Sequence, residues 1–268
     1  DARARLRAAG IYGPVSVEQW TADTLPHADG TVNLVVVSDP QGTPATEIMR
    51  VLSPGGMAVR YRDGAWTKIV KPVPAEQDEW THFLHDPSGN MVSADRRSGP
   101  PVRLQWSAAP QWARSHEHQA SVSAVVTANG RMFAIVDEGP TASVRLPPSW
   151  VLTARDAYSG VLLWKRSIPR WEGQLRPFRS GPAELPRRLV AVDNAVYVTL
   201  GYGEPVVRLD AATGDLIRTY GDTAGAVEIL CHAQTLYVVC GDLDAEAAAE
   251  ADRRRGAMPP PRNKRLAV

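Results

Sequence analysis

The sequence has little cysteine, no excess of one charge and no long hydrophobic run. Its two cysteines, Cys231 and Cys240, flank a predicted hairpin turn that sets Cys240 opposite Glu228, so no disulfide is implied. The 30 Lys and Arg against 29 Asp and Glu leave a net charge of +1, which excludes an overall field that attracts nucleic acid or anionic membrane. The longest purely aliphatic stretch, residues 34–37, is too short for a transmembrane segment.

Residues that interrupt secondary structure are frequent. The chain has 21 Gly and 22 Pro in 268 residues, which excludes a bundle of long helices and favours many short elements joined by turns. Six of the eight Trp lie between Trp80 and Trp171. We therefore predict an α/β segment over residues 1–72, a Pro-containing linker over 73–78 and a mainly β region over 79–268. Because the sequence begins at Asp1, we expect it to be part of a longer protein.

The first segment has the pattern of a strand, a helix and a second strand. Residues 32–39 form a continuous apolar run, which predicts a strand buried on both faces of a parallel sheet. Residues 43–52 predict a short helix that residues 53–56 stop, and residues 57–61 predict the next strand. This order indicates a Rossmann-like α/β unit.

Two strings in this segment resemble the later half of class I S-adenosylmethionine-dependent methyltransferases. They are residues 25–30 and residues 47–56, the second containing Arg-Val-Leu-Ser-Pro-Gly-Gly from Arg50. The resemblance implies S-adenosylmethionine as cofactor in a complete domain. The Gly-rich loop that would hold this cofactor does not occur in the chain, so we expect an incomplete segment that packs against its neighbour without transferase activity of its own.

The region after residue 79 contains a repeated turn. The string from Ala154 to Trp164, with an Asp, a Gly and a Trp at intervals of four, recurs in weaker form from Arg208 to Arg218. Apolar runs around an aromatic residue, each divided by a turn at residues 129–130, 193–194 and 233–234, predict three hairpins. The Asp carboxylate can accept backbone N–H groups across a tight turn, and the Gly supplies the positive φ. The Trp can then lie over the turn of a neighbouring unit.

This pattern resembles the tryptophan-docking motif of quinoprotein, or pyrroloquinoline-quinone-repeat, β-propellers. The residues that carry the motif are Ala154, Asp156, Gly160, Trp164, Asp210, Thr213 and Gly214. Residues 79–90 and 104–106 resemble the opening of such propellers. The resemblance implies a partial propeller of about three blades with an incomplete ring, an exported or periplasmic protein, and pyrroloquinoline quinone with Ca²⁺ as cofactors of the enzymes in this family.

Histidines form two close groups that suit a metal. Side chains two apart in a strand share a face, which pairs His116 with His118, and His82, His85 or Asp86 would complete a set for Zn²⁺ or another divalent ion. The other interpretation is that these side chains line a polar loop surface or donate to backbone carbonyl groups there.

Charged residues at predicted loops are the remaining candidates for ligand binding. Asp137 and Glu138 follow a predicted strand and would hold Ca²⁺ or act as a base, or else form a solvated acidic turn. Arg179, Arg187 and Arg188 lie in a long connection, where they would bind an anion or pair with acidic neighbours. The basic residues from 253 to 265 are not interleaved with aromatic residues, which argues against a nucleic-acid partner.

Taken together, these patterns predict a binding or scaffolding module that takes a protein or small-molecule ligand at the propeller face. Two alternatives stay open. One is a dehydrogenase that depends on pyrroloquinoline quinone and Ca²⁺, although the vicinal cysteine pair often found in such enzymes does not occur here. The other is a methyltransferase with a propeller as its targeting domain.

Overall fold

The computed structural model is mainly β and divides into two compact units, Asp1–Pro72 and Val73–Val268. It describes residues 1–38, 43–62, 64–100, 102, 104–110, 121–143, 146–169, 171, 185–254 and 259–268. Among these residues, none of the helices combines the length and the apolar character needed to cross a bilayer.

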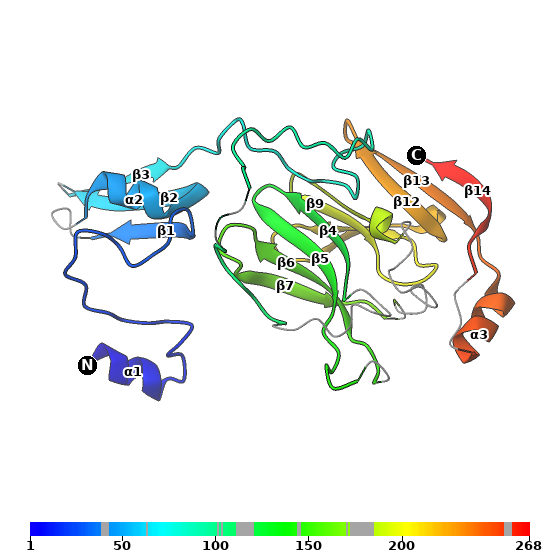
Figure 1. The fold of residues 1–268 in the computed structure, drawn as a ribbon, viewed down its shortest axis with the longest axis horizontal. Helices are drawn as coiled ribbons and strands as arrows, with labels where there is room; N and C mark the ends of the chain where they lie inside the picture. The colour runs from blue at the N-terminus through cyan, green and yellow to red at the C-terminus, as the bar shows by residue number, and fades with distance from the viewer. Residues whose placement is uncertain are drawn as a thin grey trace. The chain divides into compact units, whose positions relative to one another are not determined.

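The first unit contains a three-stranded sheet, and one helix connects the first two strands along the chain (Figure 1). Strands β1 (Val32–Val37) and β2 (Leu52–Arg62) are parallel, and β3 (Ala65–Val70) pairs with β2 in the antiparallel sense. The helices described in this unit are α1 (Ala2–Ala8) and α2 (Ala45–Val51). The chain therefore makes the predicted strand, helix and strand in order, and the likeness to a methyltransferase remains a prediction.

The prediction that the first strand is buried on both faces is wrong. Val35 packs against the small core around Ile48 of α2, but Leu34 and Val36 are 56% and 60% exposed. The alternation follows from the pleat, because successive side chains of a strand point to opposite faces. Helix α2 covers one face, and the described residues of this unit place no second layer on the other.

The boundary between the helix and the second strand also differs from the prediction. Helix α2 ends at Val51 and β2 begins at Leu52, so the Ser-Pro-Gly-Gly string lies within the strand. The pairing with β1 shifts register at this point. Gly55 has a φ of 75°, and a Cβ on Gly56 would lie 2.8 Å from the carbonyl oxygen of Ser53. The two glycines thus permit a bulge where most side chains would not fit.

Glu47 and Arg50, in the Glu-x-x-Arg string, have a structural role. Arg50 donates to both Glu47 carboxylate oxygens, at 2.8 and 2.6 Å, and to the carboxylate of Asp29 at 2.5 Å. It also donates to the carbonyl oxygens of His27 and Leu25, at 3.0 and 3.1 Å. The hydrogen bonds from Arg50 are the main cause that lowers the pKa of Glu47 to about 2, against the opposing effect of burial. This network ties residues 25–29 to α2.

The described residues of the second unit form three antiparallel sheets, two with four strands and one with three. In each sheet the strands follow one another in chain order. The strands are β4 (Val122–Ala128), β5 (Arg131–Asp137), β6 (Trp150–Asp156) and β7 (Leu162–Ser167); β8 (Leu189–Val192), β9 (Ala195–Thr199), β10 (Val206–Asp210) and β11 (Leu216–Tyr220); and β12 (Ala226–His232), β13 (Thr235–Asp242) and β14 (Arg262–Ala267).

The first strands of the three sheets lie side by side. Strand β8 contacts β4 on one side and β12 on the other. Buried side chains fill the space between the first and second sheets, with Phe133, Leu152 and Leu209 fully enclosed. A second cluster, which includes Ile229 and Val238, packs between the second and third sheets. Sheets stacked in this way around their first strands are consistent with a β-propeller-like fold.

All three predicted hairpin turns are present. Residues 129–130, 193–194 and 233–234 connect the first two strands of the three sheets, and Asn129, Asp193 and Ala233 take positive φ values of 49°, 53° and 46°. The predicted pairing of Cys240 with Glu228 is wrong. A register shift between Ala226 and Glu228 sets Cys240 opposite Ala226, and both cysteines are free and buried.

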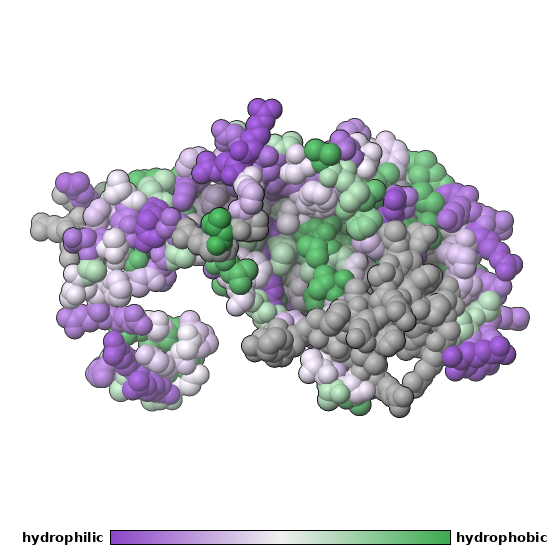
Figure 2. All heavy atoms as spheres, in the orientation of Figure 1, coloured by the Kyte–Doolittle hydropathy of each residue, from purple (hydrophilic) through white to green (hydrophobic). Residues whose placement is uncertain are grey.

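Three short helices complete the described chain. Helix α3 (Ala245–Arg253) lies within the predicted helical segment 243–256, and Arg253 and Arg254 both pair with Glu250 on it. Figure 2 shows hydrophilic side chains over α3 at the right-hand edge of the view. The 3₁₀ helices are η2 (Pro186–Arg188) and η3 (Gly221–Thr223). Helix η2 leads directly into the first strand of the second sheet.

Candidate functional site

The repeated Asp residues organise the turns after β6 and β10. Asp210 accepts hydrogen bonds from the backbone N–H groups of Thr213 and Ala212 at 2.9 and 2.8 Å, and these two bonds lower its pKa. Asp156 accepts in the same way from Ser159 at 2.7 Å and Tyr158 at 3.1 Å. Each carboxylate therefore satisfies the N–H groups of its own tight turn.

Trp164 joins the first sheet to the second. Its indole Nε1 donates to the carbonyl oxygen of Ala211 at 3.1 Å, and its ring covers Gly214 so closely that a Cβ there would lie 2.7 Å from the ring. Ala154 lies directly opposite Trp164 on the neighbouring strand and is fully buried. The motif positions thus form one contact between adjacent sheets. The first sheet supplies the Trp and the small residue opposite it, and the second sheet supplies the Asp turn with its Gly.

Trp106 makes the same contact with the turn of the first sheet. Its Nε1 donates to the carbonyl oxygen of Ala157 at 3.0 Å, and a Cβ on Gly160 would lie 2.4 Å from its ring. The sequence pattern did not assign this role to Trp106, because no Asp turn stands four residues before it. In the second sheet Arg218 replaces the tryptophan, and its guanidinium lies 4.7 Å from the ring centre of Tyr220.

The segment from Trp80 to His82 connects the first strands of all three sheets. Trp80 accepts from the N–H of Thr127 in β4 at 2.7 Å, and Thr81 accepts from the N–H of Ala191 in β8 at 3.0 Å. His82 Nε2 accepts from the N–H of Cys231 in β12 at 3.1 Å. Three consecutive residues therefore pair with three strand edges that would otherwise expose backbone donors.

The contacts of His82 define its protonation state. Because Nε2 accepts a backbone hydrogen bond, the proton of the neutral ring is on Nδ1, which lies 2.8 Å from the hydroxyl of Thr81. Burial lowers the pKa of His82 to about 4, against a smaller opposing effect of Asp86. Both ring nitrogens are engaged, so His82 has no lone pair to offer a metal in this arrangement.

His85 is held differently. Its Nε2 lies 2.7 Å from Asp78 Oδ2, and its backbone has a φ of 78°. Burial tends to raise the pKa of Asp78, but hydrogen bonds from the backbone of Ala94 and Glu79 and from His85 outweigh it and lower the pKa to about 2. The Nδ1 of His85 is buried without a hydrogen-bond partner among the described residues, and it lies 3.7 Å from Asp86 Oδ2.

Two of the other predicted site residues, Asp137 and Glu138, have partners of their own elsewhere in the second unit. His116, His118 and Arg179 lie outside the described residues. Asp137 is buried and accepts from the N–H groups of Gly139 and Ser149 at 2.9 and 2.8 Å, so it organises the loop between β5 and β6. Glu138 pairs with Lys165 at 2.7 Å. In the part of the chain that the structure describes, no three His, Cys, Asp or Glu side chains converge as metal ligands.

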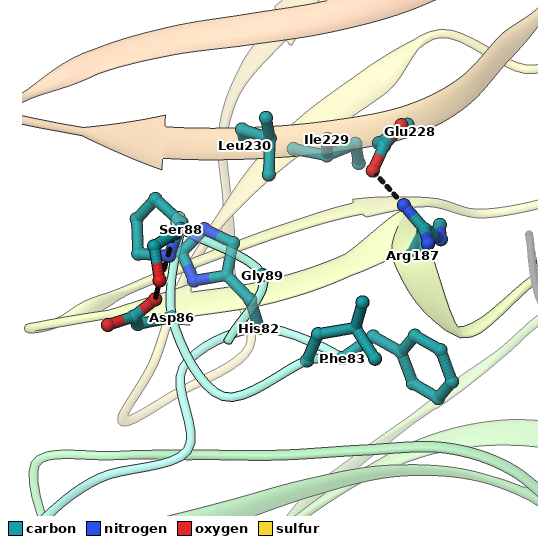
Figure 3. Close-up of a pocket in the computed structure, with 11 residues that line it drawn as sticks. His82, Phe83, Asp86, Ser88, Gly89, Arg187, Glu228, Ile229 and Leu230 are labelled. Carbon is teal, nitrogen blue, oxygen red and sulfur yellow. Dashed lines mark hydrogen bonds and ion pairs between the residues drawn. The ribbon is translucent and has the colours of Figure 1, made fainter. Parts of the chain in front are cut away.

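A cavity of about 170 Å³ lies where the segment after Trp80 passes β12. Arg187 of η2 and Glu228 of β12 form an ion pair at one end, and Asp86, bonded to Ser88, lies at the other (Figure 3). Arg188, next to Arg187, is buried within η2. The remaining lining includes apolar side chains, among them Phe83, Leu84, Ile229 and Leu230.

The inner edge of β12 supplies backbone groups to this cavity. The two-residue turn makes His232 and Thr235 a hydrogen-bonded pair, so Cys231 and Ile229 occupy the alternate positions, whose N–H and C=O groups point away from β13. The bond from the N–H of Cys231 to His82 agrees with this. The N–H and C=O of Ile229 therefore point from the strand edge toward the cavity.

The residues around this cavity do not fit a centre made of pyrroloquinoline quinone and Ca²⁺. The cavity of about 170 Å³ is smaller than the roughly 300–1,000 Å³ of cofactor pockets. The two carboxylates predicted for Ca²⁺ are engaged elsewhere, Asp137 in its loop and Glu138 with Lys165. We derive no chemical step through this cofactor.

Comparison with known proteins gives a distant likeness only. No family model matches the chain, and no curated protein matches it. Among solved structures, the quinohemoprotein alcohol dehydrogenase from Comamonas testosteroni is similar over 62% of this chain, at 14% identity and a TM-score of 0.35. The match covers 24% of that dehydrogenase, so this chain spans about a quarter of its length. This likeness assigns no activity.

Proposed function

We propose that residues 79–268, after a linker at 73–78, are blades of a quinoprotein-like β-propeller that acts as a binding module, and that the module takes an extended segment of a partner polypeptide along the inner edge of β12. The observation that carries the proposal is the edge of β12 at Ile229, whose N–H and C=O point away from β13 beside a cavity and pair with no other strand among the described residues. Main-chain pairing with an exposed strand edge is a common way to bind a peptide.

The cavity sets limits on the bound segment. Its volume of about 170 Å³ equals roughly six water molecules, which suits a chain end or a loop tip better than a large ligand. The ion pair of Arg187 with Glu228 places both charge signs at one end, and Phe83 and Leu84 supply an apolar wall. We therefore expect a short segment with a central apolar side chain and a charged neighbour.

Selection from a random hexapeptide library on the full chain tests this function. Enriched peptides should bind in calorimetry with an affinity that Glu228→Gln or Arg187→Gln lowers about tenfold, since each change removes a hydrogen-bonded charge. Lys165→Gln, which breaks the pair with Glu138 on another sheet, is the matched control and should leave the affinity unchanged.

Amide exchange gives a second readout that needs no variant. The amide of Ile229 should exchange faster than that of Cys231 in the free protein, because only Cys231 donates to His82. Binding of an enriched peptide should slow the exchange of Ile229. Failure to enrich any peptide, or an unchanged Ile229 amide in the presence of one, would remove strand addition at β12 as the function.

A further inference from the structure

A second feature, next to the cavity that Asp86 lines, is the pair formed by His85 and Asp78. When ionised, Asp78 only accepts hydrogen bonds, so the His85 proton is on Nε2, the atom 2.7 Å from Asp78 Oδ2. The lone pair of the neutral ring is then on Nδ1. A carboxylate that fixes the tautomer of a histidine in this way is the usual outer partner of a metal-binding imidazole.

The position of Asp78 is itself well fixed. Its Oδ2 also accepts from the N–H of Ala94 at 2.7 Å and from the hydroxyl of Ser93 at 3.0 Å, and its Oδ1 accepts from the N–H of Glu79 at 2.8 Å. The rings of Trp80 and His85 pack edge to face, with their centres 5.2 Å apart. This contact supports the imidazole from another direction. His85 is therefore oriented before any ligand arrives.

The free nitrogen faces a second ligand group. His85 Nδ1 is buried and has no hydrogen-bond partner among the described residues, and Asp86 Oδ2 lies 3.7 Å from it. An ion at about 2.1 Å from each atom spans this distance at an angle of roughly 120°, which a zinc site accepts after a small adjustment. The Asp86 side chain is 42% exposed, which leaves room for water as further ligands.

We propose that His85 Nδ1 and Asp86 Oδ2 bind a divalent transition-metal ion such as Zn²⁺, with Asp78 as the residue that positions His85. One imidazole nitrogen and one carboxylate oxygen are ligands that Zn²⁺ accepts. His82 takes no part as a ligand, since both its nitrogens are engaged. The structure thus separates two histidines that the sequence pattern grouped together.

Titration of the metal-stripped full chain with Zn²⁺, followed by calorimetry, tests the site, and Co²⁺ with visible absorption reports the ligand geometry. We expect one equivalent of metal to bind. His85→Asn should weaken binding by tenfold or more, and Asn tolerates the positive φ of this position. Asp86→Asn should weaken it about tenfold, and Asp78→Asn by 10–100-fold, as outer-shell changes do.

Two controls keep the result decisive. His232→Asn removes an exposed histidine at the end of β12 and should leave the affinity unchanged. Thermal melts of each variant show whether the fold is intact, and the ring ¹⁵N resonance of His85 Nδ1 should shift with Zn²⁺ in the unmodified protein. No saturable binding, equal binding by His85→Asn, or an unshifted Nδ1 resonance would overturn the proposal.

Discussion

The sheets of the second unit are joined in two different ways, at their outer turns and along their first strands. At the outer turns, Trp164 and Trp106 each cover a Gly of an Asp turn, so one contact occurs twice. Along the first strands, Trp80, Thr81 and His82 make three different hydrogen bonds, one to each sheet. The turn contact buries a large aromatic ring, whereas the central segment mainly satisfies backbone groups.

This difference shows what a repeat can and cannot encode. A contact between neighbouring units recurs with the repeat, so its residues recur in the sequence. A segment at the centre meets every unit at once and occurs once. Its residues therefore leave no periodic signal, although they include His82 and are followed closely by His85.

The largest effect should come from truncating the turn contact. Trp164→Ala removes a ring that is 9% exposed and is expected to lower the free energy of unfolding by about 3–5 kcal/mol. Urea denaturation followed by circular dichroism measures this. A loss below about 1 kcal/mol would show that the contact does not hold the two sheets together.

The next prediction concerns the same contact and changes the glycine that the Trp164 ring covers. Gly214→Ala sets a Cβ 2.7 Å from the Trp164 ring at a φ of +77°, so we expect a loss of about 2–3 kcal/mol from strain and displaced packing. Gly221→Ala is the matched control, because that glycine has open space around it and no positive φ. Equal stability of the two variants would contradict the close packing of Trp164.

The contact between His82 and Cys231, unlike the turn contact of Trp164, should make the stability of the protein depend on pH. The pKa of His82 is about 4 in the folded protein, below its ordinary 6.5, so the unfolded chain takes up a proton first as the pH falls. The unfolding free energy should therefore fall between pH 6.5 and pH 4, by an amount on the order of 2 kcal/mol.

His82→Gln, which keeps an acceptor but does not titrate, tests that assignment. The variant should lose less stability across this window than the unmodified protein does, while His232→Gln should behave like the unmodified protein. The loss that Asp78 contributes belongs to a lower window, between about pH 3.8 and 2, because its folded pKa is lowered to about 2. If the unfolding free energy of all three proteins depended on pH in the same way, His82 would not be the cause of the loss of stability in acid.

The smallest expected effect concerns the second tryptophan of the turn contact. Trp106→Phe keeps a ring but removes the bond from Nε1 to Ala157, so we expect a loss of about 1 kcal/mol. The same change at Trp164 removes the bond to Ala211 and should cost a similar amount. A much larger loss at Trp106 would mean that this residue also supports the packing of its own segment.

Much of the second unit could be predicted from its sequence, because its signals are local. The turns at residues 129–130, 193–194 and 233–234 and the Asp turns at Asp156 and Asp210 depend on residues that are close in the chain. The burial of the first strand was mispredicted, because an apolar run does not tell how many layers cover it. Cys240 lies opposite Ala226 and not opposite Glu228 because β12 has a bulge between these two residues. The sequence contains no signal that predicts this bulge.

The candidate site was predicted only as a set of residue types. The sequence by itself determined where the turns, hairpins and docking tryptophan lie, since backbone sterics and short-range hydrogen bonds act between near neighbours. Only the tertiary structure decided that His82 meets Cys231, 149 positions away, while His85 Nδ1 lies beside Asp86 with no hydrogen-bond partner among the described residues. Which nitrogen of a histidine is free depends on partners that the fold brings from distant parts of the chain.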